Sequence, residues 1–334
     1  MNTNDKKFIL APMATLSHEA FRRSVQKFGG CDEYFNEMIN APSLLHKGPF
    51  EKFYTLTGES TEAEKMVWQL TGNTPEPMAQ AAEVLSELPG LGIDLNMGCS
   101  APQIANTGAG IAWMLKPVEQ TASMVHSVKS ALENSAKDGR KPARLSVKLR
   151  LGAENFTEAG FFAFTDMLAC EGVEQFTLHP RTQKEKFARR LPRYEYAEKL
   201  ALRYPKIPVI VNGEIKDKNS LDFALSLAPH CAGVMIGRAA AKEPWIFAKL
   251  KGTLPGQKLD MLDFALNFIS DVEKFQPPEF YQTRLQRFFA YYSQNFSFGG
   301  YFKTQLLNAK DNEDARKRLA LYFEKCPEDR YRQL

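Results

Sequence analysis

The chain has few cysteines, and they form no pattern that would bind a metal or build a disulfide framework. The five cysteines are an odd number, scattered over 334 residues without any C-x-x-C pair. Disulfide-rich proteins and zinc sites both need closely spaced or paired cysteines. We therefore expect neither disulfides nor a metal site, and we expect Cys31, Cys170 and Cys231 to be small buried apolar side chains.

Long apolar runs and a complete nucleotide-binding glycine motif are also missing. No stretch of about 18 apolar residues occurs, so no segment is expected to span a membrane. Residues 1–7 lead into only a few apolar residues, unlike the core of a signal peptide. We expect a cytoplasmic protein. The segment Gly108–Gly110 lacks the third glycine of the Rossmann motif, which disfavours a dinucleotide-binding domain.

The overall composition is that of a soluble globular protein. Hydrophobic residues make up 44% of the chain and charged residues 25%, with a net charge of +4. These values exclude disordered and fibrous classes. An α/β barrel of about 250 residues is one domain, so this length allows a barrel and a smaller second domain.

Short β-rich apolar segments recur along most of the chain, each followed by a longer helical segment. The eight expected strands are Phe8–Met13, Glu33–Ile39, Met66–Leu70, Gly92–Gly98, Arg144–Arg150, Gln175–His179, Pro208–Gly213 and Gly233–Gly237. Helical patterns lie between them, for example over 76–88, 118–133, 158–171 and 221–228. This alternation predicts the α/β class and a (β/α)8 TIM barrel.

The pattern changes near residue 253. Beyond it we expect no further strand, only helices over 259–274, 281–296, 302–307 and 312–326. We therefore predict a TIM-barrel domain over residues 1–253 and an all-helical domain over residues 254–334.

Chemically capable residues collect at the carboxyl ends of seven of the eight strands. Active sites of parallel barrels form at that rim, because the βα loops converge there. In chain order the residues are Pro12, Met13, Ala14, Gln69, Asn96, Cys99, Lys148, Arg150, His179, Arg181, Asn212, Gly213, Glu214, Gly237 and Arg238. Asn36 and Glu37, after the second strand, rank below them. We expect a single ligand site at the rim.

Strands seven and eight end in glycine. Gly213 and Gly237 would let backbone N–H groups approach a phosphate closely, with Arg238 as a bidentate clamp. Alternatively, the glycines serve tight turns and Arg238 pairs with a nearby carboxylate. Both explanations remain open.

Lys148 is expected to face the interior or the mouth of the barrel, since side chains alternate along a strand. It either forms an internal salt bridge with Asp94, Glu37 or Glu214, or places a cation where a ligand develops negative charge. Cys99 lies one residue past a strand, beside a polar loop. Because free thiols are mostly protonated at neutral pH, an accessible thiol there can act as a proton donor.

Basic residues are concentrated between positions 181 and 206. That run holds nine basic and three acidic residues, a local charge of +6. A solvated helix face would explain it; contacts to nucleic-acid phosphates would also explain it. In the tail, aromatic and basic residues interleave from Arg284 to Lys303, and helical core packing accounts for most of those aromatic side chains.

Six of these motifs, in this order, resemble the tRNA-dihydrouridine synthase family. They are 11–14, 94–99, 147–152, 178–182, 209–215 and 234–238, the last followed by 244–247. The likeness covers residues 8–250 and continues more weakly at 284–292, where the family has a basic RNA-facing helix. Ser100 replaces the family's usual proline, and Glu214 stands where aspartate is commoner.

The resemblance implies an enzyme that reduces the C5=C6 bond of a D-loop uridine in tRNA, using FMN and NADPH or NADH. The base must leave its stack to enter such a site. Cys99 would be the catalytic proton donor, and Asn96, Arg181 and Arg193 would bind the substrate. FMN would be held by Pro12, Met13, Ala14, Gln69, Lys148, His179, Asn212, Gly213, Glu214, Gly237 and Arg238. We expect a monomer that binds neither membrane nor metal.

Two other functions stay open. An FMN oxidoreductase for small molecules would use the same barrel residues, but it would not explain the basic run or the helical tail. An RNA-binding protein without activity would explain the basic run, and the presence of Cys99 and Lys148 counts against it.

Overall fold

The structure, a computed structural model, describes residues 5–46, 62–136, 141–185, 191–254, 256 and 258–334. Its strands are β1 (Lys7–Leu10), β2 (Glu33–Phe35), β3 (Ile39–Asn40), β4 (Met66–Thr71), β5 (Gly92–Met97), β6 (Arg144–Leu149), β7 (Gln175–Leu178), β8 (Val209–Asn212), β9 (Gly233–Ile236), β10 (Lys258–Asp260) and β11 (Tyr331–Gln333). Its helices are α1 (Glu19–Gln26), α2 (Ala41–Leu45), α4 (Pro75–Ser86), α5 (Pro102–Ala105), α6 (Val118–Ser135), α7 (Glu158–Cys170), α8 (Glu195–Arg203), α9 (Lys218–Leu227), α10 (Arg238–Lys242), α11 (Ile246–Lys251), α12 (Met261–Phe275), α13 (Tyr281–Tyr292), α14 (Gly299–Leu307) and α15 (Asn312–Lys325).

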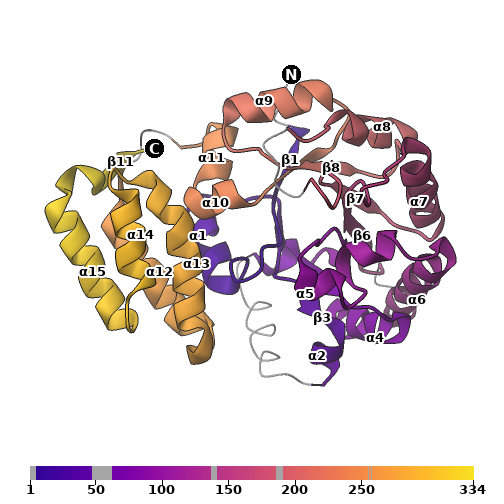
Figure 1. The fold of residues 1–334 in the computed structure, drawn as a ribbon, viewed down its shortest axis with the longest axis horizontal. Coiled ribbons are helices and arrows are strands. Elements are labelled where there is room, and N and C mark those ends of the chain that lie inside the picture. The colour runs from indigo at the N-terminus through magenta and orange to yellow at the C-terminus, as the bar shows by residue number, and fades with distance from the viewer. Residues whose placement is uncertain (1–4, 47–61, 137–140, 186–190, 255, 257) are drawn as a thin grey trace.

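Eight parallel strands close into a barrel surrounded by helices (Figure 1). They follow the order β2-β1-β9-β8-β7-β6-β5-β4, and the pairing of β2 with β4 closes the ring. The predicted TIM barrel is confirmed, with a strand inside each of the eight expected segments. The second expected strand is divided: β2 ends at Phe35, and Ile39–Asn40 pair separately with the end of β4.

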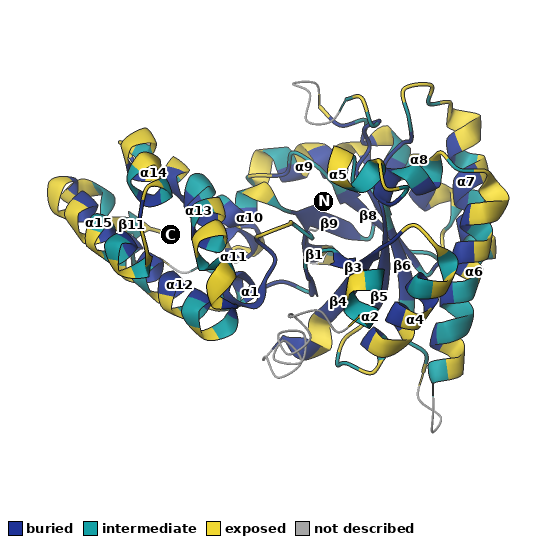
Figure 2. Ribbon diagram, turned by 60° about the horizontal axis from the view of Figure 1, so that its bottom comes forward, coloured by how far each residue is buried: buried dark blue, intermediate teal, exposed yellow. Residues whose placement is uncertain are grey.

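Side-chain alternation sorts the strand residues between two environments. Outward-facing side chains pack against the helices, and most residues of the barrel strands are buried (Figure 2). Inward-facing side chains form a small apolar cluster, made of Ile9, Ala11, Phe35, Val67, Ile210 and Met235. The inward positions of β5, β6 and β7 are polar instead, namely Asp94, Asn96, Arg144, Ser146, Lys148, Gln175 and Thr177. One half of the barrel interior is therefore apolar and the other half polar.

The region after residue 253 consists mainly of helices α12 to α15, which lie beside α1 and α10 of the barrel (Figure 1). Its core is aromatic: the Phe268 and Phe288 rings stack with centroids 3.8 Å apart. Phe288, Phe289 and Tyr292 are buried, which confirms core packing as the explanation for most of these aromatic residues. The predicted boundary falls just after α11, where Gly252 adopts a left-handed conformation with φ 69°.

The four predicted C-terminal helices are confirmed, but the expectation that no strand follows residue 253 is wrong. β10 pairs antiparallel with β11. Each strand has only three residues, too few for a period-two pattern to be recognised. Within the described ranges, none of the helices is both long and apolar enough to cross a membrane.

A buried ion-pair network closes the barrel at the amino ends of its strands. The Glu33 carboxylate on β2 accepts two hydrogen bonds from Arg144 on β6, at 3.0 and 2.8 Å. It also accepts one from Lys7 on β1, at 2.9 Å. Burial alone would raise the pKa of Glu33, but Arg144 and Lys7 outweigh that effect and lower its pKa to about 2. Three strands are thus joined across the barrel floor.

We predict that Glu33→Gln destabilises the protein by about 3 kcal/mol at neutral pH, because moving a carboxyl pKa from 4.5 to about 2 corresponds to that free energy. The folded-state pKa lies below the unfolded one. This stabilisation is therefore complete above pH 4.5 and disappears as the pH falls from 4.5 toward 2. Urea unfolding across that interval measures both effects, with the exposed Glu64→Gln as control. A Glu33→Gln variant with wild-type stability and pH dependence would contradict the prediction.

Candidate functional site

Cys99 occupies the loop that follows β5, and its backbone is held on both sides. Its N–H donates to Asn96 Oδ1 at 2.9 Å, and its carbonyl accepts from Ile111 N at 3.0 Å. Gly110 has φ 60°, and a Cβ there would lie 2.6 Å from the Cys99 carbonyl oxygen. Only glycine lets the chain return so closely. The thiol itself is free and half-buried.

Two cations lie beside this loop. Arg150 Nε donates to the Gly98 carbonyl at 2.9 Å, and Cys99 is near enough that a thiolate would favour the protonated forms of Lys148 and Arg150. Burial, then the neighbouring Arg150, lowers the pKa of Lys148 to about 8. Lys148 is therefore still mainly cationic at pH 7.

The internal salt bridge considered for Lys148 does not form. Its ammonium has no hydrogen bond or ion pair with any residue in the described part of the chain. The three carboxylates considered as partners are engaged elsewhere. Glu37 pairs with Arg284, Glu214 pairs with Arg238, and Asp94 accepts from Gln69 and Ser146. The donors of Lys148 are thus left without an acceptor among the described residues.

His179 and Gly213 meet at the ends of β7 and β8. His179 is buried, and burial, followed by Arg150 and other nearby cations, lowers its pKa well below the usual value. Its imidazole is therefore neutral at pH 7. Gly213 has φ 123°, and a Cβ there would lie 2.8 Å from His179 Cδ2. Glycine is thus needed here for two reasons: the positive φ, and the lack of room for a Cβ beside His179.

Glu214 joins two arginines of the rim. Arg238 Nη2 donates to Glu214 Oε1 at 2.7 Å, and Arg181 Nη2 lies 3.6 Å from the same oxygen. The carboxylate pairing considered for Arg238 therefore exists. Glu214 adopts φ 53°, a conformation that non-glycine residues rarely use. Such backbone outliers often occur where a loop serves a ligand.

The ends of β1 and β9 complete the rim. The Met13 N–H donates to Ser17 Oγ at 2.8 Å, and a Cβ at Gly237 would lie 3.2 Å from Met13 Sδ. Asn212 Nδ2 donates to the Met235 carbonyl at 2.8 Å. Pro12 is half-buried and Ala14 is exposed. Gln69 joins the rim through a hydrogen bond from Asn96 at 2.9 Å.

Several buried polar atoms near the rim have no hydrogen-bond partner within the described ranges. They are Asn36 Nδ2, Thr71 Oγ1 and Thr177 Oγ1. Asn36 was ranked low from the sequence, although its Oδ1 accepts from Gln69 N at 2.6 Å. In the sequence, nothing marked the two threonines as site residues except their inward-facing positions in strands. Orphaned buried donors are expensive, so these atoms indicate a polar ligand.

Arg193 does not join this set, although Arg181, at the start of the basic run, does. Arg193 donates to Glu185 at 2.9 Å, and its guanidinium lies 5.0 Å from the centre of the Phe156 ring. The paired cations of the run are Arg181, Lys184, Arg193, Lys199 and Arg203, with partners Glu214, Glu154, Glu185, Glu158 and Asp166. Lys186, Arg189 and Arg190 lie outside the described residues.

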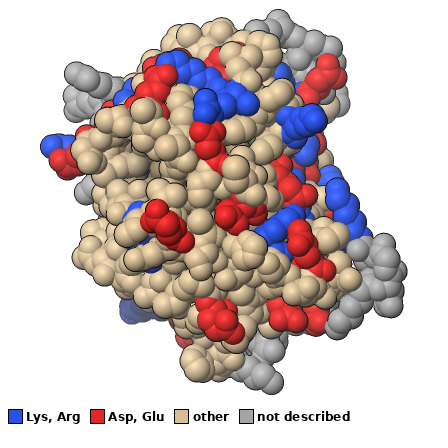
Figure 3. All heavy atoms as spheres, turned by 90° about the vertical axis from the view of Figure 1, so that its right-hand side faces the viewer, with Lys and Arg blue, Asp and Glu red and all other residues tan. Residues whose placement is uncertain are grey.

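Four of these five acidic partners lie outside the run, so they offset part of its local charge of +6. On the side of the barrel where α6 and α7 lie, basic and acidic side chains adjoin one another rather than separate into patches (Figure 3). The expectation for Cys170 is wrong: it is exposed. As the last residue of α7, it lies off the buried stripe formed by Phe161, Phe164 and Leu168. Cys31 and Cys231 are buried as expected.

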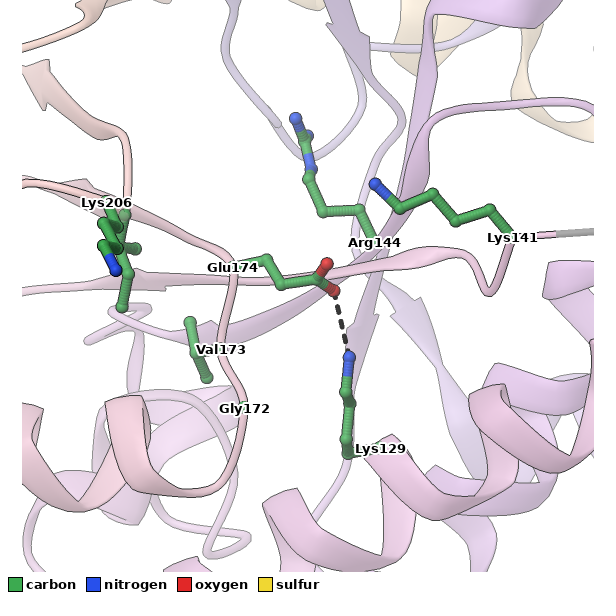
Figure 4. Close-up of a pocket in the computed structure, with 8 residues that line it drawn as sticks. Lys129, Lys141, Arg144, Gly172, Val173, Glu174 and Lys206 are labelled. Carbon is green, nitrogen blue, oxygen red and sulfur yellow. Dashed lines mark hydrogen bonds and ion pairs between the residues drawn. The ribbon is translucent and has the colours of Figure 1, made fainter.

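A cavity of about 490 Å³ opens at the opposite end of the barrel. Its lining comes from α6 and from the segments that enter β6, β7 and β8, including Lys129, Lys141, Arg144, Glu174 and Lys206 (Figure 4). Glu174 sits among the cations and pairs with Lys129 at 3.1 Å, and Arg144 is held by Glu33. This cavity is separate from the rim, and its charge is partly compensated.

Comparison with known proteins places this geometry in a family. The model of the dihydrouridine synthase family matches residues 9–327. A probable tRNA-dihydrouridine synthase of Aquifex aeolicus is 33% identical over 75% of this chain and 74% of that protein. One of Helicobacter pylori is 32% identical over 74% and 71%, and one of Staphylococcus aureus is 29% identical over 96% and 94%. With its barrel rim intact and nearly its whole length matched, the chain belongs to the dihydrouridine synthase family.

Proposed function

We propose that the protein reduces the C5=C6 bond of a D-loop uridine in tRNA to dihydrouridine, using FMN and NAD(P)H. The observation that carries this proposal is the half-buried Cys99 on a fixed loop beside the unpaired Lys148. Family membership supports the reaction, and the names of the similar proteins support tRNA as substrate.

The rim residues fit FMN. Asn36 and Thr177 present buried polar atoms without partners in the described ranges, and the half-buried Lys148 has no ion pair there, which suits the acceptors and donors of a flavin ring. Gly213 and Gly237 leave space that a Cβ would fill, which suits close contact with a phosphate. Arg238 would reach that phosphate only by sharing or leaving Glu214. Pro12, Met13, Ala14, Gln69, His179 and Asn212 would complete the site.

A reduced flavin bound there would supply hydride to C6 of the uracil. The chain must then supply a proton to C5, and we assign that proton to the Cys99 thiol. His179 is a poorer donor, because its lowered pKa leaves it neutral at pH 7. Lys148 is better placed to hold charge on the cofactor than to lose its proton. Asn96 and Arg181 would contact the base or its phosphate. Arg193 is paired with Glu185, so it would have to release that carboxylate to bind the substrate.

The helical region offers an additional contact for RNA. Arg284 on α13, in the segment that resembles the family's RNA-facing helix, pairs with Glu37 and so anchors the helix to the barrel. Arg287, one turn further along, is exposed, and the described part of the chain offers it no ion pair. We assign Arg287 to a phosphate of the bound tRNA.

The first prediction concerns the cofactor. The purified protein should be yellow and should release FMN on denaturation. Lys148→Ala should weaken FMN binding about tenfold or more, since it removes a charge-assisted hydrogen bond. Titration of the FMN-free protein with FMN measures this, with Lys206→Ala, an exposed lysine at the far end of the barrel, as control. A colourless protein that does not take up FMN would refute the flavin proposal.

The second prediction concerns RNA. Arg287→Glu should weaken tRNA binding and reduce the slope of log affinity against log salt by about 1, the loss expected for one phosphate contact. Lys206→Glu makes the same change in net charge far from the rim and should leave the slope unchanged. Oxidation of NADPH with oxygen as acceptor should persist in both variants. Equal salt slopes in wild type and Arg287→Glu would remove Arg287 from the interface.

The third prediction concerns Cys99. A proton donor acts only when carbon is protonated, so Cys99→Ala should bind FMN and accept hydride from NADPH normally. Loss of a general acid typically costs about 10²–10⁴-fold, and tRNA reduction should fall by that factor. The measurement is single-turnover reoxidation of the reduced flavin by unmodified tRNA. Cys170→Ala, at an exposed cysteine, is the control. Equal rates for Cys99→Ala and wild type would assign the proton to another group.

A further inference from the structure

A chain of hydrogen bonds runs from the barrel interior to the Cys99 loop. Gln69 Nε2 donates to Asp94 Oδ2 at 2.8 Å, and Asn96 Nδ2 donates to Gln69 Oε1 at 2.9 Å. Asn96 Oδ1 in turn accepts the backbone N–H groups of Gly98, at 3.2 Å, and of Cys99, at 2.9 Å. Asp94, Gln69 and Asn96 are buried.

The order of donors and acceptors in this series of hydrogen bonds is fixed at both ends. An ionised carboxylate only accepts hydrogen bonds, and a backbone N–H only donates. Asp94 therefore requires the nitrogen of the Gln69 amide to face it, which leaves the Gln69 oxygen facing Asn96. Asn96 must then present its nitrogen to Gln69 and its oxygen to the loop. Turning either amide over would set two donors or two acceptors against each other in a dry interior.

We propose that Asp94 is a positioning residue: through Gln69 and Asn96 it fixes the amide orientations that hold the Cys99 loop against the rim. The chemical importance of that loop rests on the function proposed above, but the hydrogen-bond chain does not. Asp94 itself lies two links away from the loop, so its effect passes through the amides.

The surroundings of Asp94 favour this role. Its second oxygen accepts from Ser146 Oγ at 2.7 Å, so both oxygens are engaged. Burial raises its pKa to about 6, while Gln69 and Ser146, through their hydrogen bonds, oppose the rise. Above that pH the carboxylate is ionised, which is the form that only accepts. A purely structural aspartate would need partners, but it would not need a directed series of amides ending at the backbone of the Cys99 loop.

The chain also predicts which substitutions preserve it. Asp94→Asn keeps an acceptor for Gln69 and can donate its new N–H to Ser146, so the direction of the chain survives. Asp94→Leu keeps the number and branching of the side-chain heavy atoms but removes the acceptor. Ser146→Ala deletes an equally buried hydrogen bond to the same carboxylate without touching the amides, and it is the matched control.

Hydrogen exchange at the Gly98 and Cys99 amides tests the proposal without any enzyme assay. Asp94→Leu should accelerate exchange there about tenfold, the factor that corresponds to one hydrogen bond, whereas Asp94→Asn and Ser146→Ala should exchange like wild type. If Asp94→Leu does not fold, Gln69→Leu interrupts the chain one link later and should give the same acceleration. Wild-type exchange in these leucine variants, or equal acceleration in Ser146→Ala or Asp94→Asn, would overturn the proposal.

Single-turnover reduction of tRNA is measured on the same variants to separate the two ideas. We expect Asp94→Leu to lose tRNA reduction together with amide protection, and Asp94→Asn to retain both. A wild-type protein that does not reduce tRNA would refute the proposed function, and the exchange rates would still decide the role of Asp94.

Discussion

The polar half of the barrel interior is the constraint on which the rest of the molecule depends. A barrel core made of branched apolar side chains needs only shape to be stable, whereas buried carboxylates need partners in fixed geometry. Here Glu33 is satisfied by Arg144 and Lys7 at the floor. One level higher, Asp94 is satisfied by Ser146 and Gln69. These pairings connect β1, β2, β4, β5 and β6 through their side chains as well as through their backbones.

The extent to which buried polar groups find hydrogen-bond partners differs between the two ends of the barrel axis. At the floor Glu33 meets Arg144 and Lys7. At the rim some charged groups are paired, as Arg238 is with Glu214, and other polar groups are not. Lys148 has no partner in the described part of the chain, and Asn36 and Thr177 keep buried donors without acceptors. The apolar side of the interior, around Ile210 and Met235, cannot supply these acceptors. The floor therefore stabilises the fold, and the rim retains buried polar atoms without partners among the described residues.

The barrel could be predicted from the sequence because each of its strands and helices is marked by a pattern of neighbouring residues. A period-two apolar pattern and a following helix can be recognised in each segment, and the carboxyl ends of parallel strands must share one rim. Residues such as Gln69, Lys148 and Gly213 could therefore be grouped without a structure. Partners from distant segments could not be found in this way. The acids that neutralise Lys199 and Arg203 lie on α7, and the partner of Arg284 lies after β2. Part of the charge of the basic run is therefore offset by acids that the sequence pattern could not place beside it.

The junction between the barrel and the helical region shows how such distant pairing serves the site. Arg284 crosses from α13 to Glu37, close to the end of β2, while α1 packs against α12. His18 is buried at this junction, 6.2 Å from the centre of the Phe268 ring, and neither of its nitrogens has a hydrogen bond within the described ranges. Burial, then Arg284 and Arg22, lowers the pKa of His18 well below the usual value.

A neutral imidazole is the form that this junction accommodates, since a protonated one would place a third cation beside two arginines. The β1–α1 loop that carries His18 also carries Met13, whose N–H is held by Ser17. The packing that docks the helical region therefore acts on the same loop that forms part of the rim. Through that shared loop, one interface sets the position of the helical region relative to the barrel rim.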